Sequence, residues 1–306
     1  MRILVAGSSG LVGSAIARAL EMTSHEVVRV SSKVVDLTDR RATFDFLHEV
    51  KPDAVIDAAA KVGGIGANNS QPVEFLSSNV QIQTNLMDAA HAVNVERFVF
   101  LGSSCIYPRD AQQPIKEESL LTGPLEATNS AYAIAKIAGI ELIRSYRREY
   151  GRRWISLMPT NLYGPADNFD LATSHVLPAL IRRFSEAVEN GSSEVVLWGT
   201  GLPRREFLHV DDLANAVLLC MERYDDDQIL NVGVGSDVTI KELAEIIASV
   251  TGFQGEILWD SSKPDGTPRK VLDVSRIVEL GWSPKITLKD GIIQTLAWYR
   301  ENLKRG

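Results

Sequence analysis

The sequence predicts an α/β fold in which a doubly wound parallel sheet carries a smaller, discontinuous C-terminal substrate lobe. In the first half of the chain, short apolar segments alternate with longer segments whose apolar residues recur at helical spacing. Short continuous apolar runs are typical of strands that are buried on both faces of a sheet. Regular alternation of such strands with helices favours a parallel sheet with right-handed crossovers.

The predicted elements of the first half follow one another without a break. The apolar run at residues 2–6 is the first predicted strand, and residues 11–20 form the first predicted helix. The further elements can be given together. Strands are expected at residues 26–30, 54–57, 98–101 and 154–158, and helices at residues 39–49, 72–93 and 130–150.

The alternation is lost after Tyr163-Gly164-Pro165, which indicates a second unit. Helices are expected there at residues 174–190, 240–250 and 288–302, with short strands at 195–198 and 257–259. The chain is expected to return to the sheet around residues 207–230. We therefore predict a sheet domain of residues 1–165 and 207–235, a substrate lobe formed mainly by residues 166–206 and 236–306, and a ligand cleft between them.

The composition is ordinary for a soluble globular protein and argues against several partners. The chain has 306 residues, of which 45% are hydrophobic and 23% charged. A net charge of −7 without a Lys/Arg cluster argues against nucleic acid and anionic membranes as partners. No apolar stretch approaches the ~18 residues of a membrane span. Two cysteines, and a first strand that starts at Arg2 without room for a signal peptide, predict a cytoplasmic protein.

The turn after the first strand is a glycine-rich loop, Gly7-Ser8-Ser9-Gly10-Leu11-Val12-Gly13. Between a strand and a helix, this G-x-x-G-x-x-G spacing is typical of a Rossmann-type dinucleotide site. Gly7 allows the tight turn, Gly10 lets the backbone approach a pyrophosphate, and Gly13 lets the helix pack closely on the strand. The helix N-terminus then faces the anion, so a bound dinucleotide is predicted.

The segment after the second predicted strand indicates which dinucleotide binds. Sites for NAD usually place an acid at this strand end, where it binds the ribose hydroxyls. Here Ser31-Ser32-Lys33 follows the strand, and the first acid is Asp36. Two hydroxyls and an ammonium suit a 2′-phosphate, with Arg29 as a further candidate, so NADP(H) is predicted. Contact of Asp36 with a ribose or with the adenine is the alternative.

A second constellation, formed by Ser103, Tyr132 and Lys136, predicts chemistry at a carbonyl. Tyr132 and Lys136 are spaced i, i+4 and therefore lie on one helix face. A nearby ammonium is expected to favour the phenolate over the ordinary pKa of ~10, so that the tyrosine can exchange a proton with a substrate oxygen. Ser103 and Ser104 follow the fourth predicted strand, at the sheet edge where ligands bind. Ser103 is the predicted partner of the substrate oxygen, and a Tyr–Lys surface pair is the alternative interpretation.

Several longer motifs are more specific than the Tyr–Lys spacing. They are Ala60-Lys61-Val62-Gly63-Gly64-Ile65, Gly102-Ser103-Ser104-Cys105-Ile106-Tyr107-Pro108, Pro159-Thr160-Asn161-Leu162-Tyr163-Gly164-Pro165, Asp167-Asn168-Phe169 and Lys263-Pro264-Asp265-Gly266-Thr267-Pro268-Arg269-Lys270. Over nearly its whole length, the chain resembles the GDP-L-fucose synthase family, within the extended short-chain dehydrogenase/reductases that act on nucleotide sugars. It departs from some members at Ser9 and Ser32, where they carry arginine, so Lys33 is expected to contribute more to phosphate binding.

The resemblance implies an enzyme that converts GDP-4-keto-6-deoxy-D-mannose to GDP-L-fucose with NADPH. Such an enzyme epimerises C3 and C5 and then reduces the C4 ketone, all in one site. By the same resemblance, Ser103, Tyr132 and Lys136 form the reductase triad, Cys105 is the base of the epimerisation and His175 is the acid. The C4 ketone acidifies the C3 and C5 protons, and thiol and imidazole groups titrate near neutrality. A small buried cysteine and a structural histidine are the alternative interpretations.

Further ligand contacts are implied by the resemblance. The GDP end is expected to bind Arg183, Trp198, Arg205 and Asp265, although Arg204 and Arg269 carry equally suitable charge. Solvated arginines and a core tryptophan are the alternative at these positions. A homodimer that packs the 72–93 and 130–150 helices together is expected, and no metal site is predicted. Besides the glycine loop, the expected cofactor residues are Ser32, Lys33, Asp36, Leu37, Leu101, Gly102, Ser103, Ser104, Lys136, Pro159, Thr160, Asn161, Leu162 and His175.

Other functions remain as alternatives at this point. A 4-epimerase of the same fold needs neither Cys105 nor His175. A 4,6-dehydratase typically has Asp-Glu after its catalytic Ser or Thr, where this chain has Ser104-Cys105. A non-catalytic dinucleotide sensor usually loses the tyrosine or the lysine, and this chain retains both.

Overall fold

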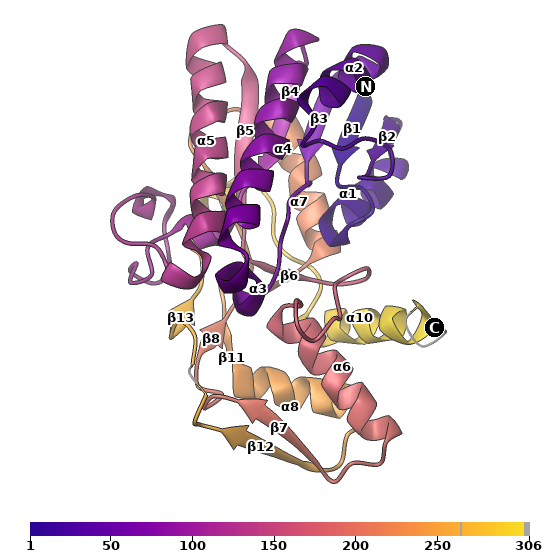
Figure 1. Cartoon of the computed structure of the whole chain (residues 1–306), viewed down its shortest axis with the longest axis vertical. Coiled ribbons are helices and arrows are strands. Elements are labelled where there is room, and N and C mark those ends of the chain that lie inside the picture. Colours follow the sequence, from indigo (N-terminus) through magenta and orange to yellow (C-terminus); the bar gives the residue numbers. More distant parts are fainter. Residues whose placement is uncertain (264, 303–306) are drawn as a thin grey trace.

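The computed structural model describes residues 1–263 and 265–302 and confirms the predicted doubly wound α/β fold (Figure 1). A six-stranded parallel sheet has the order β10-β5-β4-β3-β1-β2. The order reverses at β1, which lies between β2 and β3, and ligands of such sheets bind beyond the carboxyl ends of the strands at this switch point. The strands are β1 (Arg2–Ala6), β2 (Glu26–Val30), β3 (Ala54–Asp57), β4 (Arg97–Leu101), β5 (Arg153–Pro159) and β10 (Leu230–Val232).

Helices cover both faces of this sheet. Ile3 and Ile56 belong to the face that packs on α1 and α7, whereas Leu4 and Phe98 belong to the face that packs on α2, α4 and α5. Side chains alternate between faces along a strand, so burial on both faces explains the continuous apolar runs. Among the described helices, none has both the length and the apolar composition that a membrane crossing requires. These helices are α1 (Leu11–Glu21), α2 (Arg40–Val50), α4 (Pro72–Ala92), α5 (Ser130–Tyr150) and α7 (Val210–Arg223).

A smaller lobe lies below the sheet in Figure 1 and has a core of its own. Phe184, Ile247 and Ile292 are fully buried in this core and come from three different helices. Strands β7 and β12 pair in parallel, and β8 lies between β11 and β13 in a second small sheet. The elements are α6 (Val176–Glu189), β7 (Glu194–Trp198), β8 (Arg204–Arg205), β11 (Val238–Thr239), α8 (Ile240–Thr251), β12 (Glu256–Asp260), β13 (Arg269–Lys270) and α10 (Leu288–Asn302).

The chain passes between the two parts more than once. Strand β6 (Asn161–Tyr163) pairs in parallel with β9 (Phe207–His209), and β10 then joins the large sheet beside β5. The fully buried carboxylate of Glu206 accepts hydrogen bonds from the backbone N–H groups of Val234, Gly235 and Leu272. One side chain thus ties together segments that are far apart in the sequence, which fixes the path that leads to the site.

The structure differs from the sequence prediction mainly in short elements and in strand ends. Helices α3 (Ile65–Ser70) and α9 (Ser275–Glu279) were not predicted, because a few residues carry no readable period. The helix expected from residue 174 begins at Val176, with His175 as its N-cap residue. Strand β4 begins one residue early, at Arg97, a buried charged residue that interrupts the apolar pattern.

Candidate active site

The glycine-rich loop joins β1 to α1 at the switch point. Gly7 has φ +75°, and a Cβ atom there would lie 2.6 Å from the carbonyl oxygen of Ala58. A Cβ on Gly13 would overlap the carbonyl oxygen of Gly7, whereas one on Gly10 would meet that oxygen at an ordinary 3.5 Å. Helix α1 has no side-chain cap and no acid in its first turn. Packing therefore requires Gly7 and Gly13, and the helix N-terminus presents N–H groups suited to an anion.

The segment after β2 presents exposed polar groups, as a phosphate site would need. The carboxylate of Asp36 accepts hydrogen bonds from the N–H (2.9 Å) and the hydroxyl (2.7 Å) of Thr38, and these bonds lower its pKa. Arg29 is not free for a phosphate, since its guanidinium is paired with Glu21 on α1 at 2.7 Å. The predicted residues Ser32, Lys33 and Asp36 of this segment are exposed, as is Ser9 in the glycine loop.

Most other predicted cofactor residues lie at the carboxyl ends of β4 and β5. The Thr160 N–H donates to the Val232 carbonyl at 3.0 Å, and the Asn161 side chain donates to the Glu206 carbonyl at 2.8 Å. A Cβ on Gly102 would overlap the side chain of Met158, so the backbone here is closely packed. The group comprises Leu101, Gly102, Ser104, Pro159, Thr160, Asn161 and Leu162, while Leu37 is buried beyond β2 and Ser8 is buried against Val30.

Ser103, Tyr132 and Lys136 come together at the carboxyl end of β4. The Ser103 hydroxyl accepts a hydrogen bond from the Cys105 N–H at 3.2 Å and also bonds the Tyr132 hydroxyl. Lys136 is buried, and its Nζ donates to the Leu101 carbonyl at 2.9 Å. The predicted spacing of Tyr132 and Lys136 on one helix face is present in α5. The arrangement places two hydroxyls and an ammonium at one strand end.

The pKa of Tyr132 differs from the sequence expectation. Burial raises it above its ordinary value of 10, the negative charges of Cys105 and Asp57 raise it further, and the Ser103 hydrogen bond lowers it only in part. The Lys136 Nζ lies 6.0 Å from the ring centroid and is engaged by the Leu101 carbonyl. The expectation of a phenolate near neutral pH was therefore wrong for this structure. Tyr132 remains a phenol, which is the form that donates a proton.

Cys105 is partly exposed, and its sulfur lies 3.6 Å from the Nζ of Lys270. The second cysteine, Cys220, is fully buried in the core of the sheet domain. Lys270 lies on β13, whose parallel pairing with β8 places it opposite Arg205. Lys270 was not predicted as a site residue, although it ends the motif that begins at Lys263.

His175 is the N-cap residue of α6, but its side chain does not cap the helix. The preceding residues pack on the 63–64 loop: the Gly64 N–H donates to the Thr173 carbonyl at 2.9 Å, and a Cβ on Gly64 would lie 2.6 Å from the Ser174 carbonyl oxygen. His175 is exposed to solvent, yet partial desolvation by the surrounding protein atoms lowers the pKa of its imidazole below 6.5. No hydrogen bond among the described residues joins His175 to Cys105 or Tyr132.

Two residues predicted at the GDP end have surroundings that suit a ligand. The side chain of Trp198 is 68% exposed, which excludes the core interpretation, and the Lys263 Nζ lies 5.9 Å from its ring centroid. The Asp265 carboxylate accepts hydrogen bonds from the N–H (2.9 Å) and hydroxyl (2.7 Å) of Thr200. These bonds hold its pKa below the ordinary range. Asp265 thus ties the loop after β7 to the loop before β13.

The four candidate arginines fall into two groups. Arg205 is partly buried and donates to the Thr267 carbonyl at 2.5 Å; burial lowers its pKa, while the charges of Cys105 and Asp265 act to raise it. The guanidinium of Arg183 on α6 donates to the Val196 carbonyl at 3.3 Å. The other group consists of Arg204 and Arg269, which both pair with Asp237. Their charge is compensated by this carboxylate, whereas Arg205 lies between the Cys105 region and the Asp265 loop.

A buried acid that was not predicted from the sequence lies at the site. Asp57 ends β3 at the switch point and is fully buried. Burial raises its pKa to about 6, while the charge of Lys136 acts to lower it. The sequence does contain a signal, because an acidic residue at the last position of an apolar strand is unusual. Asp57 was predicted as part of that strand but was given no role.

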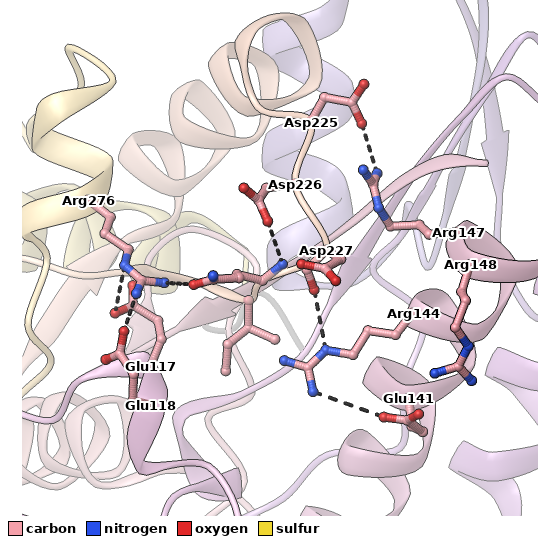
Figure 2. A pocket seen from close by; sticks show the side chains of 12 residues that line it. Glu117, Glu118, Glu141, Arg144, Arg147, Arg148, Asp225, Asp226, Asp227 and Arg276 are labelled. Atoms are coloured by element: carbon pink, nitrogen blue, oxygen red, sulfur yellow. Dashed lines mark hydrogen bonds and ion pairs between the residues drawn. The ribbon is translucent and has the colours of Figure 1, made fainter. Parts of the chain in front are cut away.

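An open cavity of about 1040 Å³ lies elsewhere, against the C-terminal half of α5 (Figure 2). Its acids and bases face one another: Arg276 pairs with Glu118, and Arg147 pairs with Asp225 at 2.8 Å. None of its lining residues belongs to the predicted site. The chemistry of the candidate site therefore lies at the sheet edge, away from this cavity.

Comparison with known proteins gives consistent matches. The model of the "NAD dependent epimerase/dehydratase family" matches residues 3–233. The chain is 56% identical over 305 residues to "Probable GDP-L-fucose synthase 1" of Oryza sativa subsp. japonica, covering 99% of this chain and 93% of that protein. It is 51% identical over 314 residues to "GDP-L-fucose synthase" of Escherichia coli (strain K12), covering 99% and 98%. A solved GDP-L-fucose synthetase from Naegleria fowleri bound to NADP superposes with a TM-score of 0.91 at 31% identity, covering 99% of this chain and 94% of that one.

Proposed function

Since this chain belongs to the NAD dependent epimerase/dehydratase family, we propose that it converts GDP-4-keto-6-deoxy-D-mannose to GDP-L-fucose with NADPH. The reaction comprises epimerisation at C3 and C5, followed by reduction of the C4 ketone. The single observation that carries this proposal is the meeting of Ser103, Cys105 and Tyr132 at one strand end. A thiol and two hydroxyls in that arrangement serve both half-reactions.

The loop after β1 fits a dinucleotide. Gly7 and Gly13 occupy positions that a Cβ would fill, and the first turn of α1 offers uncapped N–H groups for a pyrophosphate. Ser9, Ser32 and Lys33 are the exposed groups proposed for the 2′-phosphate. The residues at the ends of β4 and β5 would hold the nicotinamide half. When bound, NADPH supplies the hydride for the ketone.

Epimerisation needs a base, an acid and donors to the C4 oxygen. The ketone acidifies the neighbouring C–H bonds, and the Cys105 thiolate accepts the proton while the Lys270 ammonium lies 3.6 Å from the sulfur. Hydroxyl donors from Ser103 and Tyr132 stabilise the enolate oxygen. His175 returns a proton on the opposite face. Its lowered pKa leaves the imidazole mainly neutral at pH 7, so this step is expected to slow as pH rises through that lowered pKa.

Reduction needs a proton for the ketone oxygen, which becomes the C4 hydroxyl as the carbon accepts a hydride. The raised pKa of Tyr132 keeps its proton available at neutral pH, and the hydroxyl of Ser103 orients it. Lys136 is held by the Leu101 carbonyl near the ring and provides positive charge as the oxygen becomes negative. These three side chains would thus position the ketone oxygen and supply its proton.

The GDP portion is proposed to bind along the smaller lobe. Arg205, whose charge is coupled to both Cys105 and Asp265, is suited to a diphosphate between the sugar and the base. Arg183 adds a second guanidinium, and the exposed ring of Trp198 offers a stacking surface. Accordingly, the sheet domain is proposed to bind the cofactor, and residues 166–206 and 236–306 the nucleotide sugar.

The two half-reactions can be separated by variants in D₂O. Tyr132→Phe should lower NADPH oxidation by about 10²–10⁴-fold, because the proton donor is lost, while deuterium still enters the keto-sugar. Cys105→Ser should abolish that exchange and leave NADPH affinity unchanged. NMR of the recovered sugar and NADPH fluorescence are the measurements.

The matched control is Cys220→Ser, which alters a buried cysteine that lies in the core of the sheet domain. It should leave the exchange rate of the folded enzyme at the wild-type value. Normal exchange in Cys105→Ser would show that the base is another residue, and normal reduction in Tyr132→Phe would remove the proposed acid.

We also propose that the enzyme is a homodimer. Helices α4 and α5 lie side by side, and their exposed apolar side chains include Val73 (76% exposed) and Ile134 (49% exposed). A four-helix interface would cover them. Light scattering that gives the mass of two chains for wild type, and of one for Val73→Glu/Ile134→Glu, would support this assembly. A single-chain mass for wild type would contradict it.

A further inference from the structure

Asp57 is an acid in the middle of the sheet. Its register partners are Ala6 on β1 and Phe100 on β4, and it is fully buried. Its Oδ1 accepts a hydrogen bond from the Ala59 N–H at 3.1 Å, whereas the buried Oδ2 has no hydrogen-bond partner among the described residues. This position is the carboxyl end of β3 at the switch point, where ligands of such sheets bind.

The groups that face Asp57 can be named element by element. Residues in register share a sheet face, so Asp57 points to the same side as Phe100, and the Lys136 Nζ lies 4.8 Å from the centroid of that ring. Helix α5 thus contributes Lys136 and Tyr132. Strands β1 and β4 contribute the uncharged Ala6 and Phe100. The buried residues of α4, a fully described helix, carry only uncharged side chains.

A buried carboxylate and a buried ammonium are each unfavourable unless another charge compensates them. Burial raises the pKa of Asp57 to about 6, and Lys136 opposes that rise. Burial lowers the pKa of Lys136, and Asp57 opposes that fall. Each group therefore favours the charged form of the other near neutral pH.

We propose that Asp57 is a positioning residue of the active site, whose carboxylate is the counter-ion that keeps Lys136 an ammonium beside Tyr132. The same negative charge disfavours ionisation of Tyr132 and so keeps the phenol protonated for reduction. The catalytic meaning of this role rests on the function proposed above, but the coupling between Asp57 and Lys136 belongs to the protein alone.

The first test is Asp57→Asn, which removes the charge, keeps the volume and retains an oxygen for the Ala59 N–H. The side-chain chemical shift of Lys136 is followed against pH in lysine-labelled enzyme without substrate. Its midpoint should fall by about one pH unit or more. The alkaline limb of kcat/KM for ketone reduction should move down by the same amount, which is about a tenfold loss per unit at alkaline pH.

Ser156→Ala is the matched control. Ser156 is buried and is the register partner of Phe100 on β5, and its hydroxyl has no hydrogen-bond partner in the described part of the chain. Its removal should not move the Lys136 midpoint. An unchanged midpoint in Asp57→Asn, or an equal shift in Ser156→Ala, would overturn the proposal.

A reciprocal measurement needs no variant at Asp57. In wild type, the Asp57 carboxyl carbon should titrate near pH 6, and Lys136→Met should move that midpoint upward. A midpoint near 4, or one that Lys136→Met leaves in place, would contradict the coupling. If the titrations of Asp57 and Lys136 are coupled but the protein does not turn over the keto-sugar, the proposed reaction is wrong and the inference about the two residues still stands.

Discussion

A buried cation lies at each end of β4, and the two cations differ in how fully their charge is compensated. At the amino end, Arg97 donates to the carbonyls of Arg153 (3.0 Å), Met221 (2.8 Å) and Tyr224 (2.8 Å). It also pairs with Asp225 at 3.8 Å. Burial acts to raise the pKa of that carboxyl, but hydrogen bonds from arginines outweigh it and hold the pKa below its ordinary range.

The carboxyl end lacks this compensation. Lys136 has one hydrogen bond, to the Leu101 carbonyl, and the buried Oδ2 of Asp57 has no partner within residues 1–263 and 265–302. Burial raises the pKa of Asp57 instead of being outweighed. A saturated polar network stabilises the fold, whereas an incompletely paired one at a switch point is suited to chemistry.

The largest expected effect is on catalysis at the carboxyl end. Lys136→Met should lower the rate of ketone reduction by about 10²–10⁴-fold, because the positive charge beside Tyr132 is lost. The free energy of unfolding should fall by less than in Arg97→Met, because the cost of burying the ammonium is removed and Asp57, which loses its counter-ion, can take up a proton. Stopped-flow NADPH oxidation and urea unfolding measure the two quantities. If Lys136→Met lost much stability but kept full activity, Lys136 would be a structural residue, as Arg97 is proposed to be.

The next effect is on stability at the amino end. Arg97→Met should lower the free energy of unfolding by about 3–5 kcal/mol, because several buried carbonyls lose their donor and Asp225 loses one of its three arginine partners. Its control is Arg153→Met, whose half-exposed side chain pairs with the same Asp225 and should matter by about 1 kcal/mol or less. Urea unfolding distinguishes them, and equal losses for both variants would refute the distinction.

Within the glycine loop, packing and ligand binding can be separated. Gly13→Ala places a methyl on the Gly7 carbonyl and should cost about 1–3 kcal/mol of stability. Gly10→Ala meets no such contact and should weaken NADPH binding alone. Thermal unfolding and fluorescence titration test the pair. Destabilisation by Gly10→Ala would argue against a purely ligand-facing role.

The smallest expected effect concerns Asp167, a second buried acid with an oxygen that no described residue hydrogen-bonds. Burial raises its pKa to about 7, so the folded state binds more protons than the unfolded state between pH ~4 and ~7. Its contribution to stability is therefore present at low pH and is lost as pH rises through that window. Asp167→Asn should be more stable than wild type at pH 8 by about 1 kcal/mol or more, but not at pH 4. Equal curves for the two proteins would contradict this.

The sequence was sufficient to predict the elements whose buried residues form a clear apolar pattern. Strands β1, β3, β4 and β5 consist mainly of buried apolar residues, and the Tyr132–Lys136 pair has a fixed helical spacing. By contrast, β8 and β13 have two residues each and exist only through their pairing. That pairing is what positions Lys270, so its contact with Cys105 was not predictable from spacing.

The charge state of the site could not be predicted from the sequence either. The sequence places Tyr132 near Lys136, which predicts a lowered pKa, but burial and neighbouring negative charges raise it. Asp57 was hidden as the last residue of an apolar strand, although it faces Lys136 from another element. Such effects depend on tertiary distances and on burial, which one-dimensional spacing does not contain.

The most direct test of the proposed function is NADPH oxidation with GDP-4-keto-6-deoxy-D-mannose, followed at 340 nm, with the product sugar identified by NMR. We predict stoichiometric oxidation and GDP-L-fucose as the product, so that one chain performs both half-reactions. An unepimerised reduced sugar would remove the roles proposed for Cys105 and His175. No oxidation, with NADPH still bound, would contradict the proposed substrate.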